Sequence, residues 1–251
     1  GKTVLITGAT AGIGRAVAKK AAEKGANLIL IARREEKLLE IKQALSSCQG
    51  GITIIPLDIS NREGVESAFQ DLLASNVSVD VLVNNAGLSL GLDSVADGSI
   101  DDWEAMIDVN IKGLLYVTRL LLPSMMATQS GQIINVGSIS GHETYPGGVV
   151  YCATKYAVAA ISEGLKKDLV DTPIRVCMVS PGMVKTEFSQ VRFRGDLKRA
   201  DDVYKGMTPL APEDVAECVM FCMQQPPHVN ISEILVLPTN QASTSLVHRQ
   251  D

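Results

Sequence analysis

Seven short apolar runs, separated by segments with helical spacing, limit most strongly the folds open to this chain. Most of these runs are continuous stretches of Val, Ile and Leu, which is typical of strands buried on both faces of a parallel sheet. The runs are Thr3–Thr7, Asn27–Ala32, Ile52–Leu57, Val79–Val83, Gln132–Val136, Ile174–Val179 and Glu233–Leu237. Strands that alternate with helices imply right-handed crossovers and a sheet covered by helices on both faces.

The segments between the runs predict the helices. They are Ile13–Lys24, Glu35–Leu45, Arg62–Ala74, Asp101–Ala127, Val149–Val170 and Glu213–Gln224. Gly25 follows the first as a C-cap signal, and Pro212 precedes the last as a helix start. The 251 residues contain no low-complexity linker, so we predict one domain, 1–251. Only Lys185–Pro209 departs from the alternation of strands and helices, since it is long and charged. Long insertions of this kind often cover binding sites, and we call residues 185–209 the lid segment.

Composition excludes several classes of protein. Hydrophobic residues make up 46% and charged residues 20% of the chain, unlike a disordered chain or a coiled coil. A net charge of −5 disfavours nucleic acid as a partner. No run approaches the ~20 apolar residues of a membrane span. The five scattered cysteines do not resemble a disulfide framework, and the first residues enter a strand without a signal peptide, so we expect a cytoplasmic protein.

A glycine-rich turn follows the first strand. Its sequence is Thr7-Gly8-Ala9-Thr10-Ala11-Gly12-Ile13-Gly14. Such a turn lets the backbone approach a pyrophosphate at the positive end of a helix. It lacks the Gly-Lys-Ser/Thr of an ATP-binding loop. The alternative is a tight turn that needs glycine for structural reasons alone.

The residues after the second strand bear on the nucleotide. An NAD site usually has an acidic residue there for the ribose 2′-hydroxyl, whereas this chain has Arg33 and Arg34. Guanidinium groups suit a 2′-phosphate by charge and geometry, which favours NADP. Alternatively, Glu35 and Glu36 pair with the two arginines at a solvated helix start. Asp58, after the third strand, is placed to contact the adenine.

Tyr151 and Lys155 lie four residues apart in a predicted helix, hence on one face. A nearby ammonium is expected to lower the pKa of the tyrosine from about 10, which makes a general acid and base. Ser138, thirteen residues upstream, can hold a substrate oxygen. Asn110 adds a polar group to an apolar helical stretch. Each residue alone has an ordinary explanation, as a surface pair or an exposed amide.

Together these motifs resemble the short-chain dehydrogenase/reductase family over the whole chain. The resemblance rests on the turn TGATAGIG, the sequence NNAG, Asn110, Ser138, YCATK and Pro181-Gly182, which occur in the order and spacing of that family. It implies a Rossmann-type α/β fold, doubly wound around a seven-stranded parallel sheet. It also implies a catalytic tetrad of Asn110, Ser138, Tyr151 and Lys155. Tyr151 would exchange a proton with the substrate, Lys155 would bind the nicotinamide ribose, and Asn110 would support a water-linked relay.

The same resemblance implies an NADP site. Its residues would be Gly8, Thr10, Gly12, Ile13, Gly14, Arg33, Arg34, Asp58, Asn85, Ala86, Gly87, Tyr151, Lys155, Pro181, Gly182, Val184 and Thr186. One departure concerns the turn, where many NADP users have a basic residue and this chain has Ala9, Thr10 and Ala11. The 2′-phosphate would then depend mainly on Arg33 and Arg34.

The last third of the chain resembles one branch of the family, the NADP-dependent 3-hydroxy acid dehydrogenases that act on serine or allo-threonine. The sequences PGMVKTEFSQVRFRGD and PPHVNISEILVLPTNQAS carry this resemblance. It implies oxidation of L-serine, L-allo-threonine or 3-hydroxyisobutyrate, or the reverse reduction. We expect Ser138, Ser140, Tyr151, Arg192 and Arg194 to contact the substrate, the arginines through its carboxylate. The alternative is that both arginines face solvent.

Other interpretations stay open at this point. The same tetrad serves a broad NADPH-dependent carbonyl reductase of diketones or β-keto esters, and a nucleotide-sensing protein could keep the fold without catalysis. Cys218 and Cys222 lie on one helical turn but have no further ligands nearby, so we expect core packing and no metal. The family commonly forms homotetramers through the two long helices. Ala157, Val158, Ala160 and Ile161 fit such a face, or equally the core of the protein itself.

Overall fold

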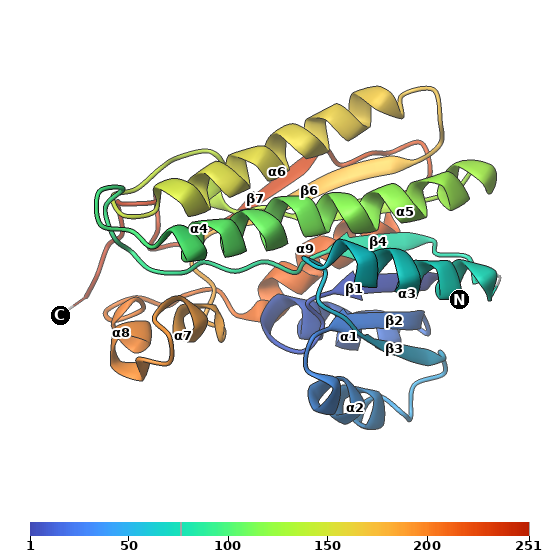
Figure 1. Ribbon diagram of the computed structural model, residues 1–251, viewed down its shortest axis with the longest axis horizontal. Helices are drawn as coiled ribbons and strands as arrows, with labels where there is room; N and C mark the ends of the chain where they lie inside the picture. Colours follow the sequence, from blue (N-terminus) through green and yellow to red (C-terminus); the bar gives the residue numbers. More distant parts are fainter. Residues whose placement is uncertain (76, 251) are drawn as a thin grey trace.

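The computed structural model describes residues 1–75 and 77–250, and within them seven strands form one parallel sheet (Figure 1). The strands are β1 (Thr3–Thr7), β2 (Asn27–Ala32), β3 (Ile52–Pro56), β4 (Val81–Asn84), β5 (Gln132–Val136), β6 (Arg175–Pro181) and β7 (Glu233–Val236). Their order in the sheet is β3-β2-β1-β4-β5-β6-β7. The order reverses between β1 and β4, where α/β sheets bind ligands at the carboxyl ends of their strands. The predicted doubly wound fold is confirmed.

Helices cover both faces of the sheet (Figure 1). They are α1 (Gly12–Glu23), α2 (Glu35–Ala44), α3 (Arg62–Ala74), α4 (Ile100–Ile107), η1 (Asp108–Gly113), α5 (Leu114–Ala127), η2 (Ile139–Gly141), α6 (Val149–Asp168), α7 (Phe188–Arg192), α8 (Leu197–Asp202) and α9 (Pro212–Gln224). Successive side chains of β1 pack into the two cores on opposite faces of the sheet. Val4 and Ile6 pack with α1, α2 and α9, whereas Leu5 packs with α3 and α5. Strand residues buried on both sides explain the continuous apolar runs.

The predicted elements match the structure within about two residues, with one difference in kind. The stretch predicted as one helix, Asp101–Ala127, contains a π-helical segment, η1, between α4 and α5. Short π segments of this type insert an extra residue into a helix and occur often at functional sites. The lid segment also has structure of its own, since it carries the short helices α7 and α8.

Candidate functional site

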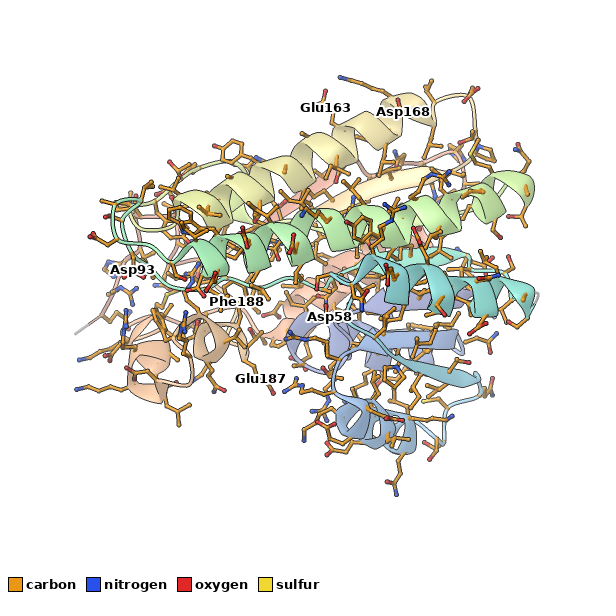
Figure 2. All side chains as sticks on the ribbon, in the orientation of Figure 1. Asp58, Asp93, Glu163, Asp168, Glu187 and Phe188 are labelled. Atoms are coloured by element: carbon orange, nitrogen blue, oxygen red, sulfur yellow. The ribbon has the colours of Figure 1, made fainter. Side chains whose placement is uncertain are left out.

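A cavity of about 380 Å³ lies at the carboxyl ends of the central strands. Figure 2 labels three of its lining residues, Asp58 after β3 and the adjacent pair Glu187 and Phe188 from the lid segment. It is also lined by most of the residues predicted to bind the cofactor, namely Gly8, Thr10, Gly12, Ile13, Arg33, Arg34, Asn85, Ala86, Gly87, Tyr151, Lys155, Pro181, Gly182, Val184 and Thr186. The fold thus gathers these segments around one space.

The glycine-rich turn is built for a close approach of backbone to ligand. Gly8 has φ +67° and Gly12 φ +51°, backbone conformations that favour glycine. A Cβ on Gly8 would lie 2.8 Å from Cα of Ala86. The Asn85 amide donates to the Thr7 and Gly8 carbonyls at 2.9 and 3.1 Å, which ties the turn to the end of β4. Gly14 lies outside the cavity lining, because it packs against this Gly8–Asn85 contact.

The N-terminus of α1 meets the chemical demands of a pyrophosphate. Its N-cap, Ala11, offers no side-chain cap, and the first turn of α1 contains no acidic residue. The first backbone N–H groups therefore lack a capping acceptor, and the helix dipole favours an anion beside them. A dinucleotide pyrophosphate fits this end of the cavity.

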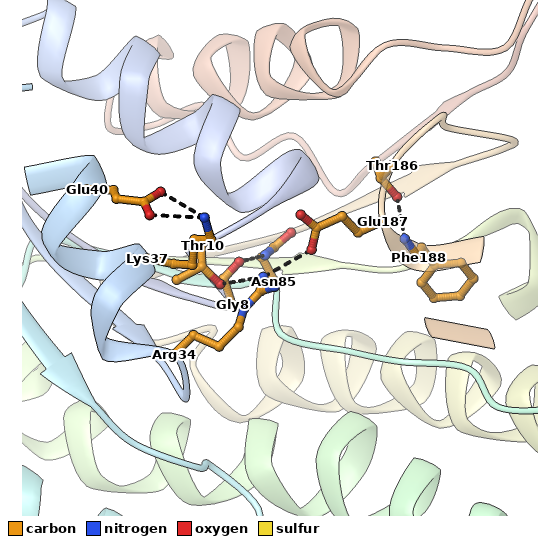
Figure 3. A network of polar contacts seen from close by, with 9 residues as sticks. All are labelled: Gly8, Thr10, Arg34, Lys37, Glu40, Asn85, Thr186, Glu187 and Phe188. Atoms are coloured by element: carbon orange, nitrogen blue, oxygen red, sulfur yellow. Dashed lines mark hydrogen bonds and ion pairs between the residues drawn. The ribbon is translucent and has the colours of Figure 1, made fainter. Parts of the chain in front are cut away.

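Arg33 and Arg34 line the same cavity, and Figure 3 shows Arg34 with its contacts to Thr10 and Glu187. Arg34 donates to Thr10 Oγ1 at 3.2 Å and to Glu187 Oε2 at 3.1 Å. The Arg33 guanidinium lies 3.8 Å from a carboxylate oxygen of Asp58. Within the described residues, these arginines pair with Asp58 and Glu187 rather than with Glu35 or Glu36. Arg33 and Arg34 both line the cavity, where guanidinium groups suit a 2′-phosphate.

Tyr151, Lys155 and Ser138 meet at the inner end of the cavity. Lys155 Nζ donates to the Val136 carbonyl at 3.0 Å and lies 6.0 Å from the centre of the Tyr151 ring. Ser138 caps η2, and its Oγ accepts from the Ser140 N–H at 3.1 Å. Ser140 is buried and lies outside the cavity lining.

Asn110 lies in the π segment and holds two neighbouring elements together. Its Oδ1 accepts from the Leu88 N–H at 2.8 Å, and its Nδ2 donates to the Leu88 carbonyl at 2.8 Å and to Thr154 Oγ1 at 3.0 Å. Asn110 does not line the cavity. It lies behind Gly87, where an added Cβ would be 3.3 Å from Asn110 Oδ1 and 3.7 Å from Lys155 Nζ.

Burial shifts the pKa of both Tyr151 and Lys155. Burial raises the pKa of Tyr151 and the neighbouring Tyr145 adds to this, whereas Arg192 and the Ser138 hydroxyl act in the opposite direction. Burial also lowers the pKa of Lys155 to about 8. The expected lowering of the Tyr151 pKa by Lys155 is not found, because burial outweighs the groups that lower this pKa, which are Arg192 and Ser138. Tyr151 carries its proton at neutral pH and can donate it.

The structure separates the two arginines predicted to contact substrate. The Arg192 guanidinium lies 5.3 Å from the Tyr151 ring centre and 5.4 Å from that of Phe188. It donates to Ser89 Oγ at 2.7 Å and also to the Tyr145 hydroxyl. Arg194 points elsewhere, because it donates to both carboxylate oxygens of Asp102 at 2.8 Å. Neither guanidinium lines the cavity itself, but only Arg192 lies against its Tyr151 wall.

Several residues at the site escaped sequence reasoning. Phe188 packs on Tyr151 with ring centres 5.6 Å apart. Tyr145 and Ser89 hold Arg192 from loops distant in sequence, and Glu187 pairs with Arg34 across the nucleotide cleft. No motif marks these four positions, since each depends on how the lid segment folds back over the sheet.

Comparison with known proteins agrees with this geometry. Residues 2–196 match the family model described as short chain dehydrogenase. The chain belongs to the short-chain dehydrogenase family. It is 44% identical to the NADP-dependent 3-hydroxy acid dehydrogenase of Schizosaccharomyces pombe, over 100% of this chain and 97% of the relative. It is also 44% identical to the NADP-dependent 3-hydroxy acid dehydrogenase YdfG of Escherichia coli strain K12, over 98% of this chain and 99% of that protein.

Solved structures of short-chain dehydrogenases resemble the fold closely. The closed form of serine dehydrogenase complexed with NADP⁺ has a TM-score of 0.93 at 44% identity, covering 99% of this chain and 100% of that one. Serine dehydrogenase from Escherichia coli has a TM-score of 0.82 at 39% identity, covering 96% and 99%. The chain is therefore an oxidoreductase of this family. In the described residues, no helix is both long and apolar enough to cross a membrane, and no group of three or more His, Cys, Asp or Glu side chains could hold a metal ion.

Proposed function

We propose that this protein is an NADP-dependent dehydrogenase of small 3-hydroxy acids such as L-serine, L-allo-threonine or 3-hydroxyisobutyrate. The observation that carries the proposal is the environment of Arg192. This guanidinium lies over Tyr151 and, within the described residues, contacts two hydroxyl groups but no acidic side chain. A charged group held this way beside a catalytic tyrosine suits a substrate carboxylate.

NADP is the cofactor. The relatives named for NADP support this, as do the uncapped end of α1 and the two arginines of the cleft. Bound NADP supplies the hydride acceptor for oxidation and, when reduced, the hydride donor for the reverse reaction. The proposed cofactor residues are those predicted from the sequence, with Gly14 acting through the packing of the turn.

The tetrad residues have separate proposed roles. Tyr151 gives its proton to the substrate carbonyl oxygen in reduction and takes it back in oxidation. Ser138 donates a hydrogen bond to the same oxygen and stabilises the charge that develops there. Lys155, held by the Val136 carbonyl, binds the nicotinamide ribose. Asn110 positions the segment around Leu88 and supports a water-linked relay to Lys155.

The carboxylate of the substrate would orient it in the site. A carboxylate paired with Arg192 would place the β-carbon of a 3-hydroxy acid beside Tyr151, because the guanidinium lies against that ring. The lid segment, 185–209, would then close over the substrate from α7. Ser140 contributes by fixing Ser138 rather than by contact with the substrate.

The test follows the reduced nicotinamide band while the enzyme is mixed with each hydroxy acid and either NADP⁺ or NAD⁺. We expect turnover with the acids and a preference for NADP⁺. Arg192→Gln should lower kcat/KM for the acids about 10²-fold, since removing one partner of a desolvated ion pair costs a few kcal/mol. Reduction of a neutral diketone should change little. Arg199→Gln, an exposed arginine of the same segment, is the matched control.

Two outcomes would contradict the proposal. Equal losses for acids and diketones in Arg192→Gln would remove its role in binding carboxylate. Turnover of diketones alone would instead support the broad carbonyl reductase. In either case Tyr151→Phe should abolish turnover while NADPH still binds, and full activity of that variant would refute the assignment of Tyr151.

We also propose a cytoplasmic homotetramer. The free thiols of Cys48, Cys152, Cys177, Cys218 and Cys222 are consistent with a reducing compartment. Of the helix positions considered for assembly, Val158 packs in the core of the chain itself, whereas Ala160 is exposed on α6. Exposed Leu115 on α5 and Tyr156 on α6 add apolar area to the same layer.

A further inference from the structure

The lid helix α7 depends on contacts from outside for its position. It spans only Phe188–Arg192, and a helix of this length is marginal on its own in water. Where α7 lies determines where Arg192 lies, since Arg192 is its last residue. The contacts that hold this end of the helix therefore decide whether the guanidinium stays over Tyr151.

Arg194, two residues after the end of α7, makes an ion pair with Asp102 on α4. Its φ of +53° is followed by φ +90° at Gly195, so the chain reverses direction immediately after α7. The left-handed conformation is unfavourable for a long side chain and persists only where surrounding contacts stabilise it. Here the guanidinium donates to both oxygens of Asp102, each at 2.8 Å. Both bonds come from the same nitrogen, Nη2, and their charges make the contact stronger than a bond between neutral groups.

Asp102 is a firm anchor for that pair. Its side chain is 14% exposed, whereas that of Arg194 is 69% exposed. Asp102 lies in the first turn of α4, where the helix dipole favours a carboxylate. Its own N–H donates to the N-cap Ser99 Oγ at 3.4 Å. The acceptor side of the pair is thus fixed to the main body of the fold.

Three further hydrogen bonds join the same stretch of the lid segment to the loop before α4. The Gly91 N–H donates to the Arg192 carbonyl at 3.1 Å. The Arg192 Nε and Nη2 donate to Ser89 Oγ at 3.0 and 2.7 Å. Arg192 and Arg194 are two residues apart, so displacement of one moves the other. The Asp102–Arg194 pair is the ionic contact of this set.

We propose that Asp102 is a positioning residue for substrate binding. Through its ion pair with Arg194 it holds the end of α7 against α4 and so keeps the Arg192 guanidinium over Tyr151. Arg194 therefore holds the lid segment in place and does not itself bind substrate. This inference rests on the proposed function, in which Arg192 binds the substrate carboxylate.

The test compares steady-state kinetics of Asp102→Asn, Arg194→Asn and the double variant with the unaltered enzyme. Asn is chosen at 194 because it tolerates the left-handed conformation. We expect each single variant to raise KM for the hydroxy acid about three- to tenfold, with kcat changed less than about twofold. NADPH affinity should not change. The double variant should be no worse than either single one, because all three lack the same pair.

Two controls separate loss of the Asp102–Arg194 ion pair from a general loss of folding. Asp101→Asn removes the same charge one residue away, where the side chain is exposed, and should leave KM unchanged. Arg194→Lys keeps the charge and should recover part of the loss. The proposal would be overturned if the KM effects of the two single variants added up in the double variant. An equal increase of KM in Asp101→Asn would also overturn it.

A second measurement does not depend on the substrate. Trypsin can cut the lid segment after Lys185, Arg192, Arg194, Lys198, Arg199 and Lys205. If Asp102 holds this segment, Asp102→Asn should be cut there several times faster than the unaltered protein or Asp101→Asn. Failure of the proposed function would appear as no turnover of hydroxy acids with this difference intact. Equal cutting rates in the three proteins would overturn the inference itself.

Discussion

At the scale of single residues, Lys155 shows how burial sets both chemistry and stability. Its ammonium is buried beside Tyr151 and has the Val136 carbonyl as a hydrogen-bond acceptor. Burial lowers its pKa from the ordinary value of 10.5 to about 8. The folded state therefore binds fewer protons than the unfolded state between pH 8 and 10.5. The buried charge therefore lowers the stability of the free protein at neutral pH.

We predict that stability of the cofactor-free protein rises with pH across that window and that Lys155→Met loses this rise. At pH 7 the variant should also be more stable by up to about 3 kcal/mol, because it buries no charge, while its activity is lost. Urea unfolding at several pH values measures both effects. Lys42→Met, an exposed lysine of α2, is the control. The same pH dependence in Lys155→Met and in the unaltered protein would contradict the prediction.

At the scale of elements, the π segment η1 is the local irregularity on which the site depends. It turns Asn110 toward the Leu88 backbone and Thr154 on α6. Its last residue, Gly113, lies against Ile59, where an added Cβ would be 2.8 Å from the side chain and 3.0 Å from the carbonyl oxygen. Glycine at this position lets the helix approach the loop after β3.

Gly113→Ala should lower stability by about 1–3 kcal/mol, since overpacking displaces the helix, and should lower kcat because Asn110 moves with it. Thermal unfolding and kinetics of one preparation measure both. Gly164→Ala is the matched control: an added Cβ there meets no atom within 4 Å, so the better helix former should keep or raise stability. Unchanged stability and activity in Gly113→Ala would show that η1 tolerates the extra methyl group.

At the scale of the whole molecule, helices α4, α5 and α6 form the layer that carries both Asn110 and the Tyr151–Lys155 pair (Figure 1). The outer side of α6 includes two small exposed residues, Ala153 and Ala160. Small side chains let two helices approach closely. An assembly through this layer would stabilise the helices that position the site.

We predict a particle of about 107 kDa, four times the 26.8 kDa of one chain. Ala160→Glu should reduce this mass, because a buried carboxylate at a helix contact lacks a partner. Lys42→Glu introduces the same residue on the opposite layer and should leave the mass unchanged. Light scattering coupled to gel filtration measures it. A mass of one chain for the unaltered protein would exclude the tetramer.

The sequence predicted elements and motifs well because both depend on local spacing. Val, Ile and Leu in β1 or β5 face two cores at once, so their runs are visible without any tertiary information. The Gly8–Gly14 turn and the Tyr151–Lys155 spacing are local as well. The π segment was missed because the spacing of apolar residues does not distinguish it from a regular helix, and the contact of Gly113 with Ile59 is visible only in the fold.

The sequence by itself determined the doubly wound sheet, the glycine-rich turn at its switch point and the pairing of Tyr151 with Lys155. Tertiary structure alone decided that Arg192 lies over Tyr151 while Arg194, two residues later, pairs with Asp102. It also decided that burial raises the pKa of Tyr151. The physical reason is the range of the interactions: periodicity and turns act over a few residues, whereas ion pairs and desolvation depend on segments about a hundred residues apart.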